Sequence, residues 1–452
     1  MNMKKPLALL LAAGMTFGLA ACGGGSQGST ETPASGSNTP SASGDTVSIE
    51  LWTYPIGKFG DQETLNGIIT AFNEVHPEIQ VTIELLDYTN GDTQVTSAIQ
   101  GGSAPDIIME GPERLVTNYG ANGLMVDLSD LWTEEATADI AATSQAVVNA
   151  CQLNGVYYEY PLCMTTHCMA INYEVFEAAG ALQYIDEETR TWSTEDFVNA
   201  MAAIRDAAAA GTVNVAVPGI VYCGGQGGDQ GTRALVNNLY SGTYTNADHT
   251  EYTANSAENV QALELLQTMV NDGSLDASAS FQATEELQQF ANGTTAVTFC
   301  WNASNQSQYA SQVQFTPFAM AFPSDDEQPE LCGGIYGFGI FDNGDEAKIE
   351  AAKEFIRFVC DDAEQGPESV RLSGFFPARA SYGNVYEGTE DSDRMAEFQT
   401  LMPYLGDYYN VIGGWTEQRT LWWNMLQQVL VNGEDAQTAA DSFVEQANAD
   451  IG

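Results

Sequence analysis

The sequence predicts an α/β fold in which helices cover both faces of a mainly parallel sheet. Runs with the two-residue periodicity of strands alternate with runs whose apolar residues recur at helical spacing. The chain is also long, with 452 residues of which 44% are hydrophobic. Such a chain can bury a large core and form two or three domains.

The first three predicted elements follow one another closely. Residues 47–53 (VSIELWT) alternate like a strand. Residues 63–76 form a helix, because Leu65, Ile68, Ile69 and Phe72 share one stripe and Pro77 ends the pattern. A second strand at 79–85 follows directly.

The pattern then repeats. Residues 93–100 predict a helix that ends at the glycine pair 101–102, and residues 105–109 predict a buried strand. This β-α-β-α-β order is typical of a parallel sheet. Further strand-like runs occupy residues 213–221, 295–299 and 331–341.

The N-terminus carries the signature of export. Two lysines precede an apolar stretch from Pro6 to Leu19, and the sequence Leu-Ala-Ala then leads to Cys22. This stretch is similar to a bacterial lipobox, in which the cysteine is lipidated. We therefore expect residues 1–21 to be a lipoprotein signal peptide and the Gly/Ser/Thr-rich residues 22–45 to be a flexible tether. The expected location is the cell membrane, with the body on the extracellular side.

Charge and cysteine content exclude several classes of function. With 61 acidic and 14 basic residues the formal net charge is −47, which disfavours nucleic acid as a partner. Three histidines and the absence of a Cys-x-x-Cys pair argue against a zinc or haem site, and we predict neither metal nor cofactor. The seven cysteines after Cys22 predict mostly buried thiols, with Cys163 and Cys168 as the nearest candidates for a disulfide.

The candidate ligand-binding residues are those that follow the predicted strands. Ligands of open α/β sheets bind beyond the carboxyl ends of the strands. Aromatic, amide, acidic and glycine residues cluster there, as suits the recognition of sugar hydroxyls and ring faces. From position alone the candidates are Trp52, Tyr54, Glu110, Glu113, Arg114, Tyr222, Gly225, Trp301, Asn302, Gly334 and Tyr336.

Each of these residues also has a structural interpretation. A tryptophan near a strand is as often part of the core as of a site. Glu110 and Arg114 could form a surface pair four residues apart. Trp422 and Trp423, adjacent on a predicted helix, are not expected to face the core together. The glycine run 224–228 does not match a nucleotide-binding loop, and His167 beside Cys168 lacks a third residue for nucleophilic catalysis.

Several motifs in order resemble the family 1 extracellular solute-binding proteins of ABC importers. They are Phe72-Asn73-x-x-His76-Pro77-x-Ile79, Gly101-Gly102-x-Ala104-Pro105-Asp106-Ile107-Ile108, Gly123-Leu124-Met125-x-Asp127-Leu128, Gly155-Val156-Tyr157-Tyr158-Glu159-Tyr160-Pro161, Phe290-Ala291-Asn292-Gly293-Thr294 and a closing helix at 433–449. The resemblance covers about residues 46–450. It implies a two-lobed, hinged α/β fold of the periplasmic-binding-protein type II class.

The resemblance also implies an organisation and a site. It places one lobe at 46–162 plus 333–377 and the other at 163–332 plus 378–452. It adds Thr165 and Trp415 to the candidate residues, and it assigns Trp301 to ring stacking. Glu110 stands where the maltose-binding branch has an aromatic residue and Thr165 where that branch has an acid, so maltose itself is not favoured.

The implied function is capture of a carbohydrate, expected to be an oligosaccharide, and delivery to membrane permease subunits. The protein would be monomeric and not an enzyme. Two alternatives remain open. One is a binder of another solute, such as a polyamine or a peptide; the acidic field and the aromatic residues would favour a polyamine. The other is an exported glycoside hydrolase, which needs only two suitably placed carboxylates.

Overall fold

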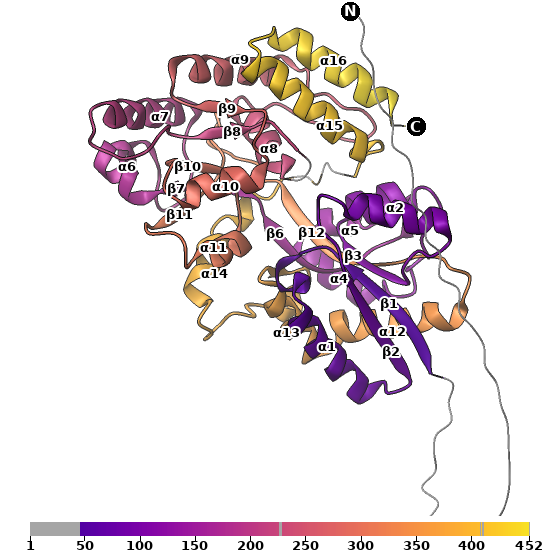
Figure 1. Cartoon of the computed structure of the whole chain (residues 1–452). Helices are drawn as coiled ribbons and strands as arrows, with labels where there is room; N and C mark the ends of the chain where they lie inside the picture. Colours follow the sequence, from indigo (N-terminus) through magenta and orange to yellow (C-terminus); the bar gives the residue numbers. More distant parts are fainter. Residues whose placement is uncertain (1–45, 226–227, 407, 409–410, 452) are drawn as a thin grey trace, which may run out of the picture. The chain divides into compact units, whose positions relative to one another are not determined.

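A parallel three-stranded unit opens the fold, as predicted. In the computed structural model, β1 (Val47–Thr53) lies between β2 (Ile79–Leu85) and β3 (Ile107–Glu110), and both pairings are parallel. The helices α1 (Gln62–Val75) and α2 (Gly91–Gly101) link these strands (Figure 1). The structure describes residues 46–451 except 226–227, 407 and 409–410, and they belong to one compact unit. The proposed leader, Cys22 and the tether lie outside the described residues.

Capping residues and apolar stripes fix the first two helices. The Asp61 side chain accepts a hydrogen bond from the Thr64 backbone N–H at 3.1 Å, which satisfies the free N-terminus of α1. The predicted stripe of α1 is buried against the sheet. α2 ends at Gly102, whose φ of +68° is accessible to glycine at little cost.

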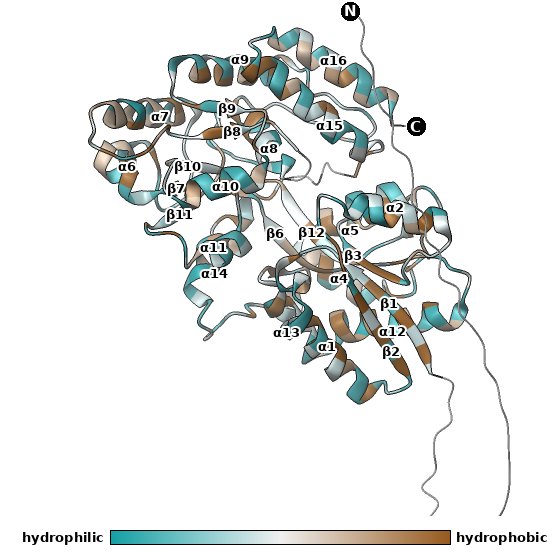
Figure 2. Cartoon of the chain, in the orientation of Figure 1, coloured by the Kyte–Doolittle hydropathy of each residue, from teal (hydrophilic) through white to brown (hydrophobic). Residues whose placement is uncertain are grey.

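The large sheet is mixed rather than mainly parallel, which corrects the prediction. Its six strands run in the order β13-β6-β12-β3-β1-β2. Strand β12 (Gly333–Ile340) is antiparallel to both β3 and β6 (Tyr160–Thr166), and β13 (Phe376–Pro377) is antiparallel to β6. Strands β12 and β13 therefore run against the direction of the opening unit, whereas β6 runs with it. Figure 2 shows hydrophobic residues along β1 and β2 and hydrophilic residues on the visible face of α10.

The chain leaves this sheet through a single residue. His167 separates β6 from β7 (Cys168–Asn172), which belongs to a second sheet of order β10-β7-β11. The His167 backbone N–H donates to the Cys332 carbonyl at 2.9 Å, just before β12 returns to the first sheet. The segment that leaves the first sheet and the segment that returns to it are thus hydrogen-bonded to each other.

The run at 213–221 forms a shorter strand than predicted. Only Ile220–Tyr222 forms a regular strand (β8), which pairs in parallel with β9 (Asp276–Ser278), while Val217 forms an isolated bridge with Thr295. Pro218 has no N–H to donate, although its carbonyl accepts hydrogen bonds from Ala296 and Val297. The proline therefore limits regular pairing on its N-terminal side.

Both adjacent tryptophans of α15 (Trp415–Leu426) are buried, so the prediction that only one could face the core is wrong. The Trp422 ring contacts Tyr244 and Phe443, and its Nε1 donates to Thr232 Oγ1 at 3.0 Å. The Trp423 ring contacts Tyr222. α15 is covered on two sides, which a one-stripe helical pattern does not anticipate.

None of the seven cysteines after Cys22 forms a disulfide with another described residue, and six of them are buried. Cys163 and Cys168 therefore form no disulfide, and Cys300 alone of the seven is partly exposed. None of the helices in the described part of the chain is both long enough and apolar enough to span a bilayer.

The other elements complete the fold (Figure 1). In chain order they are η1 (Gly57–Gly60), α3 (Pro112–Arg114), η2 (Leu115–Gly120), α4 (Glu134–Thr143), α5 (Gln145–Ala150), β4 (Gln152–Leu153), β5 (Val156–Tyr157), α6 (Tyr173–Ala179), η3 (Ala181–Tyr184), α7 (Thr194–Ala209), α8 (Asp229–Leu239), α9 (Ala257–Asp272), α10 (Ala283–Ala291), β10 (Val297–Trp301), α11 (Ala303–Tyr309), β11 (Pro317–Met320), α12 (Glu346–Asp361), α13 (Gln365–Ser373), η4 (Ala380–Tyr382), α14 (Ser392–Gln399), η5 (Met402–Tyr404), η6 (Gln427–Val431) and α16 (Ala436–Ala449).

Candidate functional site

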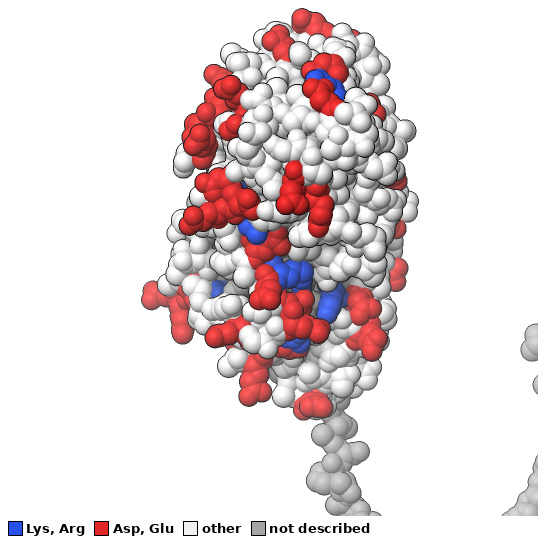
Figure 3. Space-filling model, turned by 90° about the vertical axis from the view of Figure 1, so that its left-hand side faces the viewer, with Lys and Arg blue, Asp and Glu red and all other residues white. Residues whose placement is uncertain are grey.

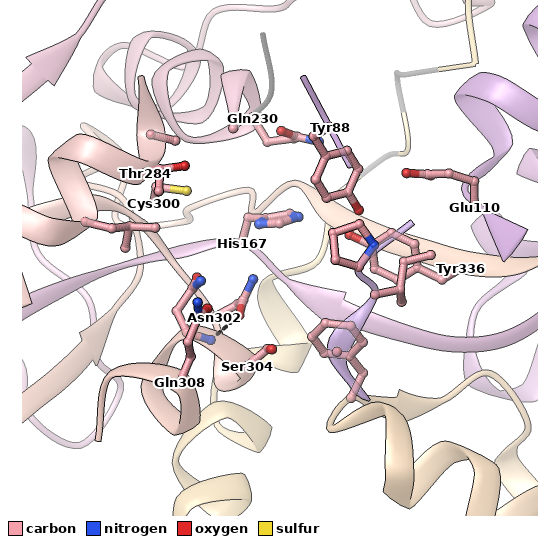
Figure 4. Close-up of a pocket in the computed structure, with 18 of the residues that line it drawn as sticks. Tyr88, Glu110, His167, Gln230, Thr284, Cys300, Asn302, Ser304, Gln308 and Tyr336 are labelled. Carbon is pink, nitrogen blue, oxygen red and sulfur yellow. Dashed lines mark hydrogen bonds between the residues drawn. The ribbon is translucent and has the colours of Figure 1, made fainter. Parts of the chain in front are cut away.

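A cavity of about 370 Å³ lies where the two sheets and α15 meet. Figure 4 shows Tyr88, Glu110 and Tyr336 on one side, Thr284, Asn302 and Gln308 on the other, and His167 between them. We call this cavity the first pocket. Its two walls differ in chemistry.

One wall is charged and begins at the end of β3. Arg114 binds Asp92 through two hydrogen bonds, Nε to Oδ1 at 2.7 Å and Nη2 to Oδ2 at 3.1 Å. Its Nη1 donates to Glu110 Oε1 at 3.1 Å. Glu110, Glu113 and Arg114 are all buried, so the pair is not the surface pair that four-residue spacing allows. A guanidinium held by a fork of this kind has a fixed orientation.

The remaining acids of this wall are also held in place. Glu110 accepts a hydrogen bond from the Gly111 backbone N–H, and Glu113 accepts one from the hydroxyl of Tyr408. Burial raises the pKa of Glu110 to about 7, although Arg114 opposes the rise, and Glu113 adds to it. Glu110 is therefore partly protonated near neutral pH and can both donate and accept hydrogen bonds.

Glu110→Gln should change how stability depends on pH. A glutamate in the unfolded chain titrates near 4.3, so between pH 4.3 and 7 the folded state holds more protons than the unfolded state. The stability due to this group is therefore lost as pH rises through that window. We expect the free energy of unfolding of the wild type, relative to the variant, to fall by up to about 1.4 kcal/mol per pH unit.

Chemical denaturation of both proteins across pH 4 to 8 measures this difference. Glu350→Gln, which replaces a carboxylate on a side chain that is 63% exposed, is the matched control for a Glu-to-Gln change outside the first pocket. A flat difference for Glu110→Gln would show that Glu110 titrates alike in the folded and unfolded chains.

The opposite wall is neutral and polar. Residues at the N-terminal ends of α8 and α10 and along α11 form it. The Asn302 side chain caps α11 by accepting a hydrogen bond from the Asn305 backbone N–H at 2.9 Å. The polar side chains of this wall are Gln230, Gln282, Thr284, Asn302, Ser304, Asn305 and Gln308. Amides and hydroxyls of this kind exchange hydrogen bonds with hydroxyl groups in either direction.

The N-terminus of α15 closes one end with a cationic group. Arg419 Nε donates to Asp229 Oδ1 at 3.0 Å, and Arg233 Nη2 lies 2.8 Å from Asp229 Oδ2. The guanidinium carbons of Arg114 and Arg419 lie 5.0 and 4.5 Å from the ring centroid of Trp415. The Trp415 ring is thus engaged by protein cations.

Two glycines allow Trp415 to reach this position. A Cβ on Gly413 would lie 2.5 Å from the Ile451 carbonyl oxygen. Gly414 has a φ of +70°. Both positions therefore require glycine, which gives the Gly-Gly-Trp motif a structural reason.

Aromatic rings face the amide wall from β12 and from the segments next to β2 and β13. Tyr336 on β12 stacks on Phe375, with centroids 5.6 Å apart and ring planes at 23°. Tyr88 stacks on Tyr54 at 5.2 Å. Of these four rings, all but Tyr54 line the first pocket and offer aromatic surface to a ligand.

His167 lies between the two walls and was not among the candidates from sequence. Burial lowers its pKa to about 4, with Asp229 opposing and Arg233 adding to the effect. Its imidazole is therefore neutral at neutral pH. Its Nε2 is buried without a hydrogen-bond partner among the described residues.

Six of the thirteen candidates line the first pocket in the structure. They are Glu110, Glu113, Arg114, Asn302, Tyr336 and Trp415. The other seven do not line it: Trp52, Tyr54, Thr165, Tyr222, Gly225, Trp301 and Gly334.

Three of those seven have a structural role that their contacts define. Trp301 is fully buried, its ring contacts Phe290 and Tyr309, and its Nε1 donates to Gln306 at 3.1 Å. Tyr54 donates to Asp92 at 2.8 Å and so supports the Arg114 fork. A Cβ on Gly334 would lie 2.7 Å from the Tyr336 hydroxyl oxygen. Gly334 thus makes room for the Tyr336 ring.

The others are also accounted for by their surroundings. Trp52 and Thr165 are buried within β1 and β6. Tyr222 donates its hydroxyl proton to the Gly228 carbonyl. A Cβ on Gly225 would lie 2.3 Å from Gln282. Tyr222 and Gly225 therefore shape the backbone behind the amide wall.

The chain belongs to the bacterial extracellular solute-binding protein family, whose model matches residues 57–366. Among curated protein sequences, none matches it. The fold is the two-lobed fold of periplasmic binding proteins, as three solved structures illustrate.

Those structures cover nearly the whole chain. An ABC substrate-binding protein of Listeria monocytogenes, solved with cycloalternan, is 20% identical with a TM-score of 0.69, covering 90% of this chain and 99% of its own. The GacH receptor of Streptomyces glaucescens, solved unliganded and with acarbose, is 15% identical with a TM-score of 0.72, covering 90% and 98%. MalE of Bdellovibrio bacteriovorus, bound to maltotriose, is 14% identical with a TM-score of 0.68, covering 89% and 99%. At these identities the likeness is one of fold.

Proposed function

We propose that the protein captures a carbohydrate in the first pocket and delivers it to a membrane importer. The observation that carries the proposal is the pairing of a wall of neutral amides and hydroxyls with a wall of aromatic rings and fixed charges. A sugar presents hydroxyls that need both donors and acceptors, and ring faces that pack on aromatic surfaces. The first pocket supplies hydrogen-bond donors, hydrogen-bond acceptors and aromatic surfaces.

The charges near the first pocket favour a neutral ligand. Arg114 is matched by Asp92 and Glu110, and Arg233 and Arg419 share Asp229. The charged groups therefore largely neutralise one another within the protein. Cycloalternan, acarbose and maltotriose, the ligands of the three similar structures, support a sugar as the cargo.

The same proposal covers location and partners. Cys22 would be lipidated and the following tether would hold the body on the extracellular side of the cell membrane. The ligand would pass to ABC permease subunits without chemical change, so the protein is not an enzyme, and it would act as a monomer. We keep the lobe boundaries at 46–162 plus 333–377 and 163–332 plus 378–452.

The surface charge supports a nonanionic cargo and partner. Figure 3 shows acidic side chains spread over the face in view, with few basic ones among them. With a formal net charge of −47 the protein repels polyanions at long range. Nucleic acid is therefore not a partner in this proposal.

Tyr336→Ala should weaken sugar binding by roughly 1 to 3 kcal/mol, because it removes an aromatic surface that faces the amide wall. Isothermal titration calorimetry with a sugar that the wild type binds measures the change in affinity. Tyr173→Ala, outside the first pocket, is the control. An unchanged affinity in a folded Tyr336→Ala protein would remove this ring from the site.

A further inference from the structure

A second cavity of about 310 Å³ lies beside the C-terminal half of α8. Its walls come from that half of the helix, from the loop at 241–247 and from the segment at 324–330. It shares no lining residue with the first pocket. We call it the second pocket.

Asn237 is the lining residue that indicates a ligand in this cavity. Its side chain is only 9% exposed, yet it forms no hydrogen bond with any described residue, and its Oδ1 is buried without a partner. The neighbouring Asn238 is fully paired, since it accepts from the Glu330 N–H at 2.7 Å and donates to the carbonyls of Ala234 and Glu330 at 2.8 Å. An unpaired buried amide costs stability, so a ligand that pairs with it gains affinity.

The rest of the lining defines the chemistry of the ligand. Ser, Thr, Asn and Gln side chains dominate, and Asp326 and Glu330 add carboxylates at the rim. Lys, Arg and His are absent from the described residues that line the cavity. The lining is rich in hydrogen-bond acceptors and lacks a cation, which suits a neutral hydroxylated ligand and not an anion.

The two pockets are neighbours along α8. Gln230 lines the first pocket, whereas Ala234 and Asn237 line the second, and the spacings of four and seven residues put all three on one helix face. Seven residues span roughly 10 Å of helix.

Gly406 and Tyr408, which are close together in the sequence, each lie beside one of the pockets, and this observation is independent of α8. A Cβ on Gly406 would lie 2.9 Å from the Cβ of Glu330, which lines the second pocket. Two residues along the chain, Tyr408 binds Glu113 of the first pocket. The short separation in sequence keeps these two contacts close in space.

We propose that the second pocket is a further saccharide-binding site, which the far end of an oligosaccharide occupies while its near end fills the first pocket. This inference rests on the proposed function and adds a preference for chain length. Ligands too short to leave the first pocket do not reach Asn237. Longer ligands pair with its amide.

Affinity measured against chain length tests the proposal. Ladders of maltodextrins, cellodextrins and xylo-oligosaccharides, from one to about seven units, are titrated into the wild type, Asn237→Leu and Gln328→Trp. Leucine keeps the size of Asn237 without its amide, and tryptophan at the exposed Gln328 obstructs the rim without disturbing the core. Asn255→Leu, which lines neither cavity, is the matched control.

We expect the wild type to bind longer members of one ladder more tightly, and both variants to lose roughly tenfold in affinity for those members only. Equal affinity at all lengths in the wild type, or equal losses at all lengths in the variants, would overturn the second site and leave the proposed function standing. Failure of every ladder to bind would contradict the proposed function itself.

Discussion

Asp229→Asn should destabilise the protein by about 3 to 5 kcal/mol, the cost of leaving buried charges without their partner. The Asp229 carboxylate is fully buried and joins Arg233 at 2.8 Å and Arg419 at 3.0 Å. Asparagine keeps the shape but removes the negative charge, so two buried guanidinium groups face each other without compensation. Urea denaturation followed by tryptophan fluorescence measures the loss.

Asp206→Asn is the matched control. Asp206 pairs with Arg205 at 2.9 Å, but its side chain is 71% exposed, and exposed pairs contribute about 0 to 1 kcal/mol. If both substitutions cost the same small amount, Asp229 does not neutralise the two arginines and our account of this end of the first pocket is wrong.

The Asp229 effect should also depend on pH. Burial alone would raise the pKa of Asp229, but Arg233 and Arg419 outweigh it and hold the pKa below its ordinary value. The stabilisation is therefore present above the unfolded pKa near 3.9 and is lost as pH falls through the lower folded pKa. The difference between wild type and Asp229→Asn should shrink in that acidic range.

Trp301→Ala should cost about 3 to 5 kcal/mol of stability, because it empties a fully buried site. The Trp301 ring packs on Phe290 at 5.4 Å and on Tyr309 at 6.3 Å and does not line the first pocket. The protein that remains folded should bind sugar with nearly unchanged affinity. Thermal unfolding and calorimetric titration on the same preparation separate the two quantities.

Trp301→Phe serves as the milder variant if the alanine protein does not fold. It retains an aromatic ring beside Phe290 and loses only the larger ring and the hydrogen bond to Gln306. A loss of sugar affinity of tenfold or more, with little loss of stability, would show that Trp301 belongs to the binding site and not only to the core.

Local periodicity predicted the opening of the fold because the forces there are local. The alternation of 47–53 gave β1 with the same limits, and the stripe of α1 is buried as expected. The antiparallel partners of β3 and β6 come from residues more than 150 positions further along the chain, and no local pattern reports such pairing. The buried Trp422 and Trp423 are a similar case, since cover on two sides of α15 depends on distant elements.

Site residues could be predicted where charged or polar side chains stand at the end of a predicted strand. Glu110 ends β3, Glu113 and Arg114 come just after it, and all three line the first pocket. The amide wall was missed, apart from Asn302, because Gln and Asn at helix N-termini look like ordinary capping or surface residues. His167 was missed because its role comes from its place between two sheets and not from a motif.

The central claim is that the first pocket binds a sugar and releases it unchanged. The most direct test is calorimetric titration of the protein with neutral mono- and oligosaccharides, polyamines and short peptides, followed by mass spectrometry of the recovered ligand. We predict saturable one-to-one binding of one sugar class, recovered intact. Recovery of shorter sugars, or binding of a polyamine or peptide alone, would contradict the account.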